Sequence, residues 1–329
     1  MRPPRRTIAS ITDGPGGKLG MFLLAGLAGL GLATVLAFAA PLGWPFELFT
    51  HFRAQYAVAA ALLAMLLLLV RRPGAAAVAG VLAALHALPA LQRSFADDPV
   101  AACGGPAFTV VTANLQYSNH DTSRFPDWLA ANPADLVVLQ ELTDTWAATL
   151  SRVPGYPQRD FLVREDPYGI GVMSRWPLRA VERRDFAGDG LPSLSGDLVM
   201  QGQSVRFLAL HTHWPILPGL AASRDRSLDA AAGLVRAGDG PAAVLGDLNL
   251  TAYSPVFARF LESAGLRDAS DEPRWSPTWM AGFWPLALRI DHVLVTPDLC
   301  VERVEVGPSI GSDHRPVIAR LRLASPAMR

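Results

Sequence analysis

Six apolar stretches of this sequence carry an acid, an amide or an imidazole at one end. FTVVTAN, DLVVLQE, FLALHTH and AAVLGDLN end in such residues, whereas RIDHVLV and GSDHRPVIARL begin with them. Taken alone, each residue has an ordinary explanation, since turns favour Asp, Asn and Ser and a histidine can be packed in a core. Their repetition indicates a shared site, because ligand sites gather where strands give way to loops. The set comprises Asn114, Glu141, His211, His213, Asp247, Asn249, Asp291, Asp313 and His314.

The oxygen-bearing members of this set predict a site for a hard divalent cation. Glu141, Asp247 and Asp313, with the amides Asn114 and Asn249, make an oxygen-rich set that suits Mg²⁺, with Mn²⁺ as a substitute. No cluster of cysteine and histidine has the spacing of a zinc site. His314 and Asp291 have the types of a general base and the acid that orients it. Hydrolysis of a phosphate ester requires that the negative charge on the phosphate oxygens be neutralised and that a water be positioned for attack. A cation site and an oriented histidine together meet both requirements.

Other catalytic constellations are missing from the sequence. The chain has no GxxxxGK(S/T) phosphate loop and no GxGxxG dinucleotide motif. Ser195, in PSLSGD, lacks the flanking glycines of a nucleophile elbow. The formal net charge is zero, with 29 basic and 29 acidic residues, which argues against a processive nucleic-acid binder. It does not argue against an enzyme that takes a single phosphodiester.

The elements that must position these residues predict an α/β domain. Short runs rich in Val, Ile, Leu and Phe are typical of strands, and the segments between them have the apolar spacing of helices. Several strands are apolar on both faces, which indicates sheets covered on both sides. The predicted strands are residues 108–114, 135–141, 169–174, 205–213, 242–249, 289–296 and 315–323, and the predicted helices are residues 124–132, 143–153, 223–238 and 254–265.

Seven motifs, in this order, closely resemble those of the endonuclease/exonuclease/phosphatase (DNase I-like) superfamily: TANLQYSN, VVLQE, GVMSRWPL, LALHTHWP, LGDLNL, RIDHVLV and GSDHRPV. The succession of GDxN and SDH is the specific part, and the resemblance runs from about Phe108 to Leu323. It implies an α/β domain over residues 107–325 in which two packed sheets are flanked by helices, a four-layer α-β-β-α sandwich with its site at one end. It also implies a metal-dependent hydrolase acting on phosphoric ester bonds.

The resemblance implies roles for the residues at the strand ends. Glu141 and Asp313 match metal-associated acids, and Asn114 lies close by. Gln116 stands where some members carry an acid, which favours one Mg²⁺ over a permanent pair.

His314 matches the family's catalytic histidine and Asp291 its orienting acid. Asp247 and Asn249 match residues that handle the attacking water and the scissile phosphate. Whether His314 or Asp247 removes the proton stays open.

The family's second, mid-chain histidine falls on His213 or His211. We favour His213 as the catalytic one and expect His211, Arg289 and Asn249 to bind the substrate.

Three apolar stretches precede the domain and predict transmembrane spans over about residues 19–42, 54–70 and 74–91. The first has no charge and is long enough to cross a bilayer, although RPPRR before it and AFAA near its end also fit a signal peptide. The third is weaker, because Ala and Gly contribute little hydrophobicity and Pro89 interrupts its end. A basic tail, residues 1–18, precedes this region (19–92), and a linker, residues 93–106, follows it.

Arginine clusters predict how the chain crosses the cytoplasmic (inner) membrane. The tail is basic, and Arg71 and Arg72 divide the second span from the third, so both clusters should stay in the cytoplasm. With three spans the domain lies on the extracytoplasmic, periplasmic side; with two it lies inside. An exported domain could join Cys103 to Cys300, but cysteine is also a common small buried residue.

The sequence therefore predicts a membrane-anchored, Mg²⁺-dependent phosphoesterase that acts on a phosphodiester, either of a lipid head group or of nucleic acid. An extracytoplasmic nuclease and a catalytically silent membrane module are the alternatives. The lipid bilayer is the expected partner, and no protein partner is indicated. WMAGFWPLAL, residues 279–288, could contact lipid, stack on a base or pack on the domain.

Overall fold

The computed structural model describes residues 15–94, 103–270 and 276–324. Most of the predicted basic tail and of the predicted linker lies outside these described residues. The chain divides into two compact units, a helical unit (Met1–Phe95) and a sandwich unit (Ala96–Arg329).

The helical unit consists of α1 (Pro15–Phe38), η2 (Ala40–Leu42), η3 (Phe46–Phe52), α2 (Arg53–Leu69) and α3 (Pro73–Ser94). Two stretches, Gly17–Phe38 and Phe46–Leu69, are long and apolar enough to cross a membrane. In α3 only the shorter stretch Pro73–Leu88 is apolar. The structure thus has helices over all three predicted spans, and two of them meet the requirement of length and composition.

Small and polar side chains link these helices. Ala76 and Ala79 of α3 are buried against Leu67 of α2, because alanine lets two helices approach closely. Thr34 of α1 and His86 of α3 share a hydrogen bond of 2.9 Å. His86, a polar residue in an apolar stretch, is therefore a packed side chain that joins two helices.

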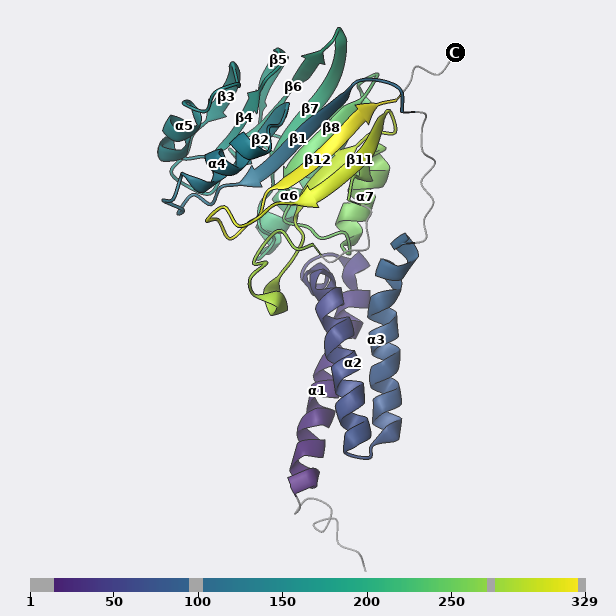
Figure 1. The fold of residues 1–329 in the computed structure, drawn as a ribbon. Coiled ribbons are helices and arrows are strands. Elements are labelled where there is room, and N and C mark those ends of the chain that lie inside the picture. Colours follow the sequence, from purple (N-terminus) through teal and green to yellow (C-terminus); the bar gives the residue numbers. More distant parts are fainter. Residues whose placement is uncertain (1–14, 95–102, 271–275, 325–329) are drawn as a thin grey trace, which may run out of the picture. The chain divides into compact units, whose positions relative to one another are not determined.

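The sandwich unit contains two six-stranded sheets (Figure 1). Sheet A has the order β11 (Leu299–Val306), β12 (Val317–Leu323), β1 (Ala107–Asn114), β2 (Leu136–Gln140), β4 (Ile170–Ser174), β3 (Gln158–Leu162). Sheet B has the order β5 (Leu178–Arg184), β6 (Ser193–Met200), β7 (Gln203–His211), β8 (Ala242–Asp247), β10 (Asp291–Val295), β9 (Arg267–Asp268).

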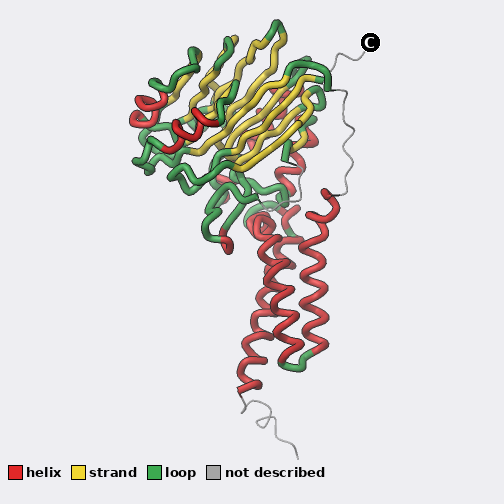
Figure 2. Tube along the Cα trace, viewed as in Figure 1, coloured by secondary structure: helices red, strands yellow, loops and turns green. Residues whose placement is uncertain are grey.

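Alternating side chains on the central strands explain why the sheets stack and carry helices outside. In β1, Val110 joins the core between the sheets, whereas Val111 packs with α4 (Arg124–Ala131) and α5 (Asp144–Leu150). In β8, Leu245 faces the inner core, whereas Val244 packs with α6 (Pro218–Arg236) and α7 (Pro255–Ala264). Because apolar residues occupy both the odd and the even positions of these strands, both faces of each sheet are buried. The layers are helices, sheet A, sheet B, helices (Figure 2), so the predicted α/β sandwich is confirmed.

Helix α7 shows how local sequence sets the ends of an element. Ser254 caps its first turn by accepting a hydrogen bond from the backbone N–H of Val256, and Pro255 occupies the first helical position. Gly265 ends the helix at φ 67°, a left-handed conformation that glycine adopts without a Cβ clash.

Two crossovers bring the ends of four strands to one end of the sandwich. β1 and β2 are parallel and joined through α4, and β7 and β8 are parallel and joined through α6. β10 runs antiparallel to β8, and β12 antiparallel to β1. The carboxyl ends of the parallel strands therefore meet the amino ends of β10 and β12. The predicted site residues lie at this end of the sandwich.

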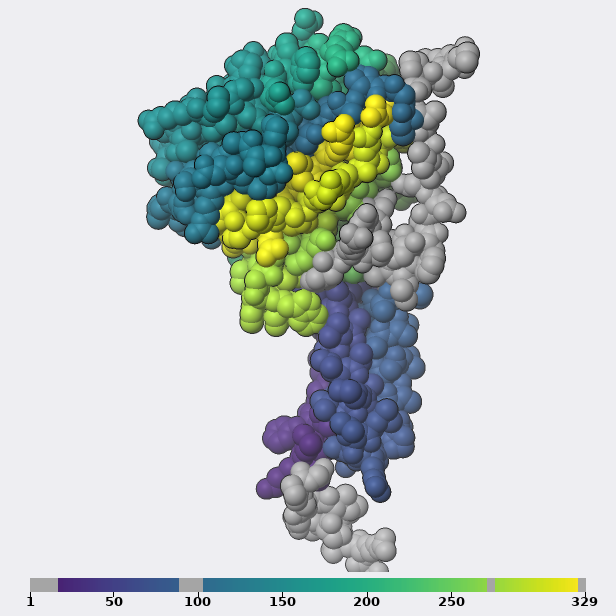
Figure 3. Space-filling model, in the orientation of Figure 1, coloured from purple at the N-terminus to yellow at the C-terminus, as the bar shows by residue number. Residues whose placement is uncertain are grey.

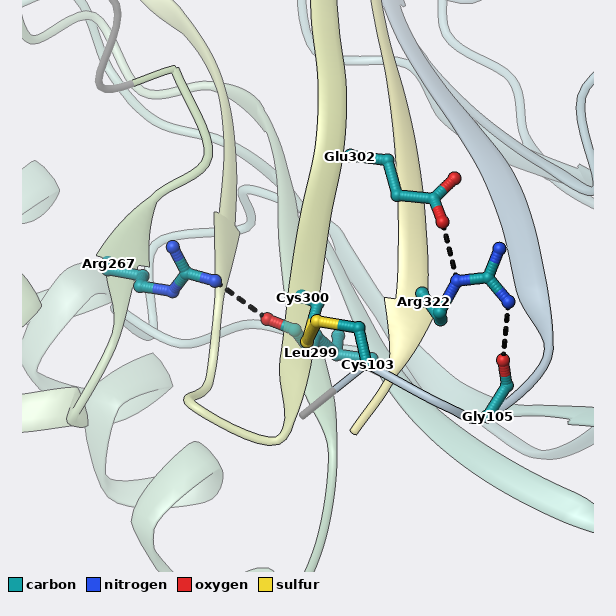
Figure 4. Close-up of a disulfide and its surroundings, with 7 residues drawn as sticks. All are labelled: Cys103, Gly105, Arg267, Leu299, Cys300, Glu302 and Arg322. Carbon is teal, nitrogen blue, oxygen red and sulfur yellow. Dashed lines mark hydrogen bonds and ion pairs between the residues drawn. A yellow bond between two sulfur atoms is a disulfide. The ribbon is translucent and has the colours of Figure 1, made fainter. Parts of the chain in front are cut away.

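A disulfide joins Cys103 to Cys300, with their Cα atoms 6.1 Å apart (Figure 4). It ties the segment before β1 to the edge strand β11. Beside it, Arg322 donates a hydrogen bond of 2.9 Å to the carbonyl of Gly105, and Arg267 donates one of 2.9 Å to that of Leu299. The disulfide that the sequence left open is thus present.

Candidate active site

Side chains from both sheets meet at this end of the sandwich. The register opposes His211 to Asp247 across β7 and β8, and Asp247 to Asp291 across β8 and β10. Asn114 ends β1 in the other sheet. We use "Asp247 cluster" for Asn114, Glu141, His211, Asp247, Asp291, Asp313 and His314, which hydrogen bonds, close ionic contacts or electrostatic coupling connect.

Asp247 is the hub of this cluster. Its Oδ2 accepts a hydrogen bond of 3.1 Å from Nδ2 of Asn114, and it lies 3.6 Å from Nε2 of His211 and 3.7 Å from Nε2 of His314. Its Oδ1 accepts a hydrogen bond of 2.9 Å from the backbone N–H of Asn249. Both oxygens are thereby held in place, so three side chains from three other strand ends converge on one buried carboxylate.

His314 and Asp291 form the pair that the sequence predicted. Nδ1 of the imidazole and Oδ2 of the carboxylate lie 2.8 Å apart, and both residues are buried. This contact leaves Nε2 of His314 directed at Asp247. The other oxygen of Asp291, Oδ1, is buried and has no hydrogen-bond partner.

Glu141 and Asp313 supply the remaining acids. Glu141 accepts hydrogen bonds from Nδ2 of Asn114 (3.0 Å) and from the backbone N–H of Tyr117 (2.8 Å). Oδ2 of Asp313 accepts one of 2.9 Å from the indole of Trp279. The charge of Asp313 acts on Glu141, which shows that the two acids are neighbours.

Asn114 links two acids through its amide nitrogen, because Nδ2 donates to both Glu141 and Asp247. Its Oδ1 accepts a hydrogen bond of 3.0 Å from the backbone N–H of Gln116. Contact of this oxygen with a cation is a prediction from the sequence.

Burial and crowding of charge set the protonation of the cluster. Burial would lower the pKa of His314, but the charges of Asp291 and Asp247 outweigh it and raise the pKa to about 10. Burial, aided by the charge of Asp291, raises the pKa of Asp247 to about 7. Burial also raises the pKa of Glu141. His314 is therefore a cation at neutral pH.

His211 differs from His314 in charge. Burial and the nearby charge of His314 lower the pKa of His211 to about 3. A neutral imidazole thus lies 3.6 Å from Asp247, within the electrostatic influence of the His314 imidazolium.

These residues fit a divalent cation. Ligand atoms of Asp247, Asp291 and His314 lie within 4.8 Å of one another, and Oδ1 of Asp291 lacks a partner. Carboxylate oxygens are the donors that hard cations prefer, and a positive charge would relieve the repulsion that raises the pKa of Asp247. Glu141 and Asp313 add further carboxylates next to this group.

Backbone conformation contributes to the convergence. Gln116, Glu141 and Asn249 have φ values of 59°, 57° and 50°, a left-handed region that residues other than glycine seldom adopt. All three lie just beyond a strand end, where the chain turns. Gly246 needs to be glycine, because a Cβ there would lie 1.7 Å from the carbonyl oxygen of Leu210.

His213 lies outside the Asp247 cluster. One ring nitrogen is 3.1 Å from the hydroxyl of Tyr168, and the other is 3.1 Å from Oδ2 of Asp189. The Tyr168 ring is centred 6.0 Å from that of His211. Tyr168 therefore connects His213 with the cluster, and the structure places His211 rather than His213 beside Asp247.

Arg289 and Asn249 have different positions. Asn249 follows Asp247, and its Nδ2 donates a hydrogen bond of 2.9 Å to the carbonyl of Thr212. Arg289 lines a separate pocket of about 350 Å³ with Ser270 and Arg303. No residue of the Asp247 cluster lines that pocket.

Three residues near the cluster carry no role in the sequence analysis: Tyr168, Asp189 and Thr278. A fourth, Trp279, appears there only as part of the segment 279–288. Thr278 Oγ1 accepts hydrogen bonds from the backbone N–H groups of Ile290 and Asp291. Tyr168 and Asp189 contact His213, and Trp279 contacts Asp313. The spacing of the sequence motifs does not identify any of these residues. The nearest sequence signal was the position of Tyr168, which directly precedes the predicted strand GIGVMS.

The family model described as "Endonuclease/Exonuclease/phosphatase family" matches residues 111–314. None of the curated protein sequences matches the chain. Among solved structures, an endonuclease/exonuclease/phosphatase from Bacteroides vulgatus is 18% identical with a TM-score of 0.58, covering 66% of this chain and 99% of its own.

Two further structures share the fold. Humanized D. rerio TDP2 is 17% identical with a TM-score of 0.55, covering 66% of this chain and 99% of its own. Sphingomyelinase C from Streptomyces griseocarneus is 21% identical with a TM-score of 0.51, covering 65% of this chain and 99% of its own.

The raised pKa of Asp247 predicts how stability of the metal-free protein depends on pH. The unfolded chain loses this proton near pH 4 and the folded chain near pH 7, so folding becomes less favourable as pH rises between these values. The loss is at most about 4 kcal/mol. Asp247→Asn removes it: in EDTA at pH 8 this variant should unfold at a higher temperature than the parent, and at pH 4.5 the gap should close.

Thermal unfolding of the detergent-solubilised full chain, followed by tryptophan fluorescence, measures this difference. A gap of equal size at both pH values would contradict the raised pKa.

Proposed function

Because the chain belongs to the endonuclease/exonuclease/phosphatase family and is therefore a metal-dependent hydrolase of phosphoric ester bonds, we propose that it is a membrane-anchored, Mg²⁺-dependent phosphodiesterase whose active site is the Asp247 cluster. One observation carries the proposal: four carboxylates and two histidines from five strand ends converge at one end of the sandwich, where burial disfavours so much negative charge.

Glu141 and Asp313 are the proposed ligands of Mg²⁺, with Asn114 close by and Mn²⁺ as a substitute. Both acids are joined to the rest of the cluster, Glu141 through Asn114 and Asp313 through its neighbour His314. A cation bound there supplies neutralisation of the charge on the non-bridging phosphate oxygens.

The chain's own residues would position the attacking water and move its proton. Nε2 of His314 and Oδ2 of Asp247 lie 3.7 Å apart. Because His314 already carries its proton at neutral pH, a water beside both groups can give its proton to Asp247 while the imidazolium stabilises the developing negative charge. Asp291 orients the imidazole through Nδ1. His211, being neutral, can hydrogen-bond a phosphate oxygen without bringing a charge.

Three assignments extend from the cluster. Asn249 lies next to Asp247 and is a proposed contact for the scissile phosphate. His213 is proposed as the second histidine, acting through the hydroxyl of Tyr168. Arg289, in the separate pocket, is proposed to contact a part of the substrate beyond the phosphate.

We place the sandwich unit on the periplasmic side of the inner membrane. Helix α3 has 22 residues, which is long enough to cross a bilayer, and three crossings put the two ends of the chain on opposite sides. Arg71 and Arg72, between α2 and α3, favour the cytoplasm. The disulfide between Cys103 and Cys300 supports an oxidising compartment, because such bonds are rare in the cytoplasm.

Removal of either partner of the proton-handling pair should abolish most catalysis. Asp247→Ala and His314→Ala should each lower kcat on a soluble phosphodiester such as bis(4-nitrophenyl) phosphate by at least about 100-fold, the scale for a positioned acid or base. The rate should also fall to background in EDTA and return with Mg²⁺ or Mn²⁺.

His120→Ala is the matched control, because this histidine is exposed, and it should retain parental activity. Near-parental rates for both Asp247→Ala and His314→Ala would refute the site.

The proposed topology predicts where a reporter fused after Leu323 is active. Alkaline phosphatase, which needs an oxidising compartment, should be active there, whereas a cytoplasmic fluorescent reporter should not. A chain truncated before Pro73 and fused to the same reporters should show the opposite pattern. Alkaline phosphatase activity confined to the truncated chain would place the sandwich unit in the cytoplasm.

A further inference from the structure

Exposed large apolar side chains of the sandwich unit gather on three short segments. Within the described part of this unit, they are Tyr117, Trp214, Ile216, Leu217, Phe283, Trp284 and Leu286. Trp214 is 56% exposed and Phe283 is 54% exposed. Elsewhere in the described part of the unit, large apolar side chains are buried or half-buried, so this distribution is not the scatter of single residues that soluble surfaces normally carry.

Each of the three segments is attached to the candidate active site. The backbone N–H of Tyr117 donates to Glu141, and residues 214–217 directly follow His213. The third segment is held at its base, where the indole of Trp279 donates to Oδ2 of Asp313 and the backbone N–H of Met280 donates to the carbonyl of Asp313, both at 2.9 Å. The three apolar segments are therefore joined to the candidate active site at their bases.

The third segment projects from the domain. The short helix Trp284–Leu286, coloured yellow-green, stands at the tip of a loop that extends beyond the two sheets (Figure 1). The space-filling view shows this yellow-green segment as a protrusion (Figure 3). Its tip is thus available to a broad surface as well as to a small molecule.

The composition of these segments fits a lipid surface. WPILPGL (214–220) and WMAGFWPLAL (279–288) contain no charged residue. Tryptophan and tyrosine favour the boundary between hydrocarbon and head groups, and Phe and Leu enter the acyl region. Nucleic acid would instead require cations along the approach, because phosphate neutralisation supplies most of its affinity.

We propose that these seven residues form an apolar rim that seats the catalytic end on the surface of a lipid bilayer, and that the substrate is the phosphodiester of a lipid head group. This inference rests on the proposed phosphodiesterase function. The candidate membrane helices of the same chain supply the bilayer at high effective concentration, so a modest apolar rim is sufficient. Bilayer contact also connects to catalysis, since Trp279 and Met280 hold Asp313.

Contact with lipid can be measured directly. Cys103 and Cys300 are paired and no free cysteine remains, so Phe283→Cys creates a single labelling site for a fluorescent dye. In the full chain reconstituted in nanodiscs, nitroxide-labelled lipids should quench this dye. A dye at Asp239→Cys, an exposed position in the turn before β8, is the control and should not be quenched. Absence of quenching at position 283, whether the dye is in water or covered by protein, would overturn the proposal.

Substrate class is tested by activity of the full chain in nanodiscs. The double variant Trp214→Ser/Phe283→Ser should lose at least about tenfold on nanodisc phospholipids, because apolar burial anchors the rim, and should stay within about twofold of the parent on bis(4-nitrophenyl) phosphate. Trp214→Phe/Phe283→Leu, which keeps the apolar character, is the matched control and should retain lipid activity.

Equal losses on lipid and on the soluble phosphodiester, or no loss on lipid, would overturn the rim. A loss on plasmid DNA as large as that on lipid would make the segments a base-stacking surface and would also overturn it. A parent that hydrolyses neither nanodisc phospholipids nor a soluble phosphodiester would refute the proposed function instead, and the quenching experiment would still decide on the rim.

Discussion

Repulsion between buried carboxylates is the constraint on which this end of the molecule depends. Asp247 and Asp291 face each other in adjacent strands, and burial together with this proximity raises the pKa of Asp247 to about 7. The fold tolerates the arrangement because His314 lies between the two acids as a cation, 2.8 Å from Asp291 and 3.7 Å from Asp247. Stability alone would not retain such a group, since buried ion pairs seldom improve on apolar packing. The divalent cation that we propose at Glu141 and Asp313 would add positive charge beside these acids and so offset part of this cost.

The strands that carry the candidate site could be predicted from sequence because each is apolar on both faces and has a polar residue at one end. Asn114, Asp247 and Asp291 are at such ends, and the crossovers that make β1 parallel to β2 and β7 parallel to β8 bring them together. The pair of His314 with Asp291 was predicted for the same reason and is present at 2.8 Å. The strands that the sequence analysis missed, β3, β5, β6, β9 and β11, include the edges of both sheets. β5 (LRAVERR) and β11 (LCVERVEV) carry exposed charges, which blunt a sheet edge and also disguise the strand.

Other features could not be predicted because they depend on distance between remote segments. The choice between His211 and His213 depends on the direction in which the chain leaves β7, and only the structure places His211 at 3.6 Å from Asp247. The Cys103–Cys300 disulfide spans 197 residues and needs the pairing of β11 with β12. Trp279 reaches Asp313 across 34 positions, and its segment has no helical or strand periodicity. In each case composition leaves more than one arrangement open, and packing between remote segments sets the distances.

The central claim is that the acids at this end of the sandwich bind a catalytic divalent cation. Crystals of the protein soaked in Mn²⁺ test it most directly, because the anomalous signal of manganese locates the ion independently of activity. The account predicts a peak within about 2.0–2.4 Å of a carboxylate oxygen of Glu141 or Asp313, and its loss in Glu141→Ala. An anomalous peak only at surface acids away from the Asp247 cluster, or a peak that persists unchanged in Glu141→Ala, would contradict the account.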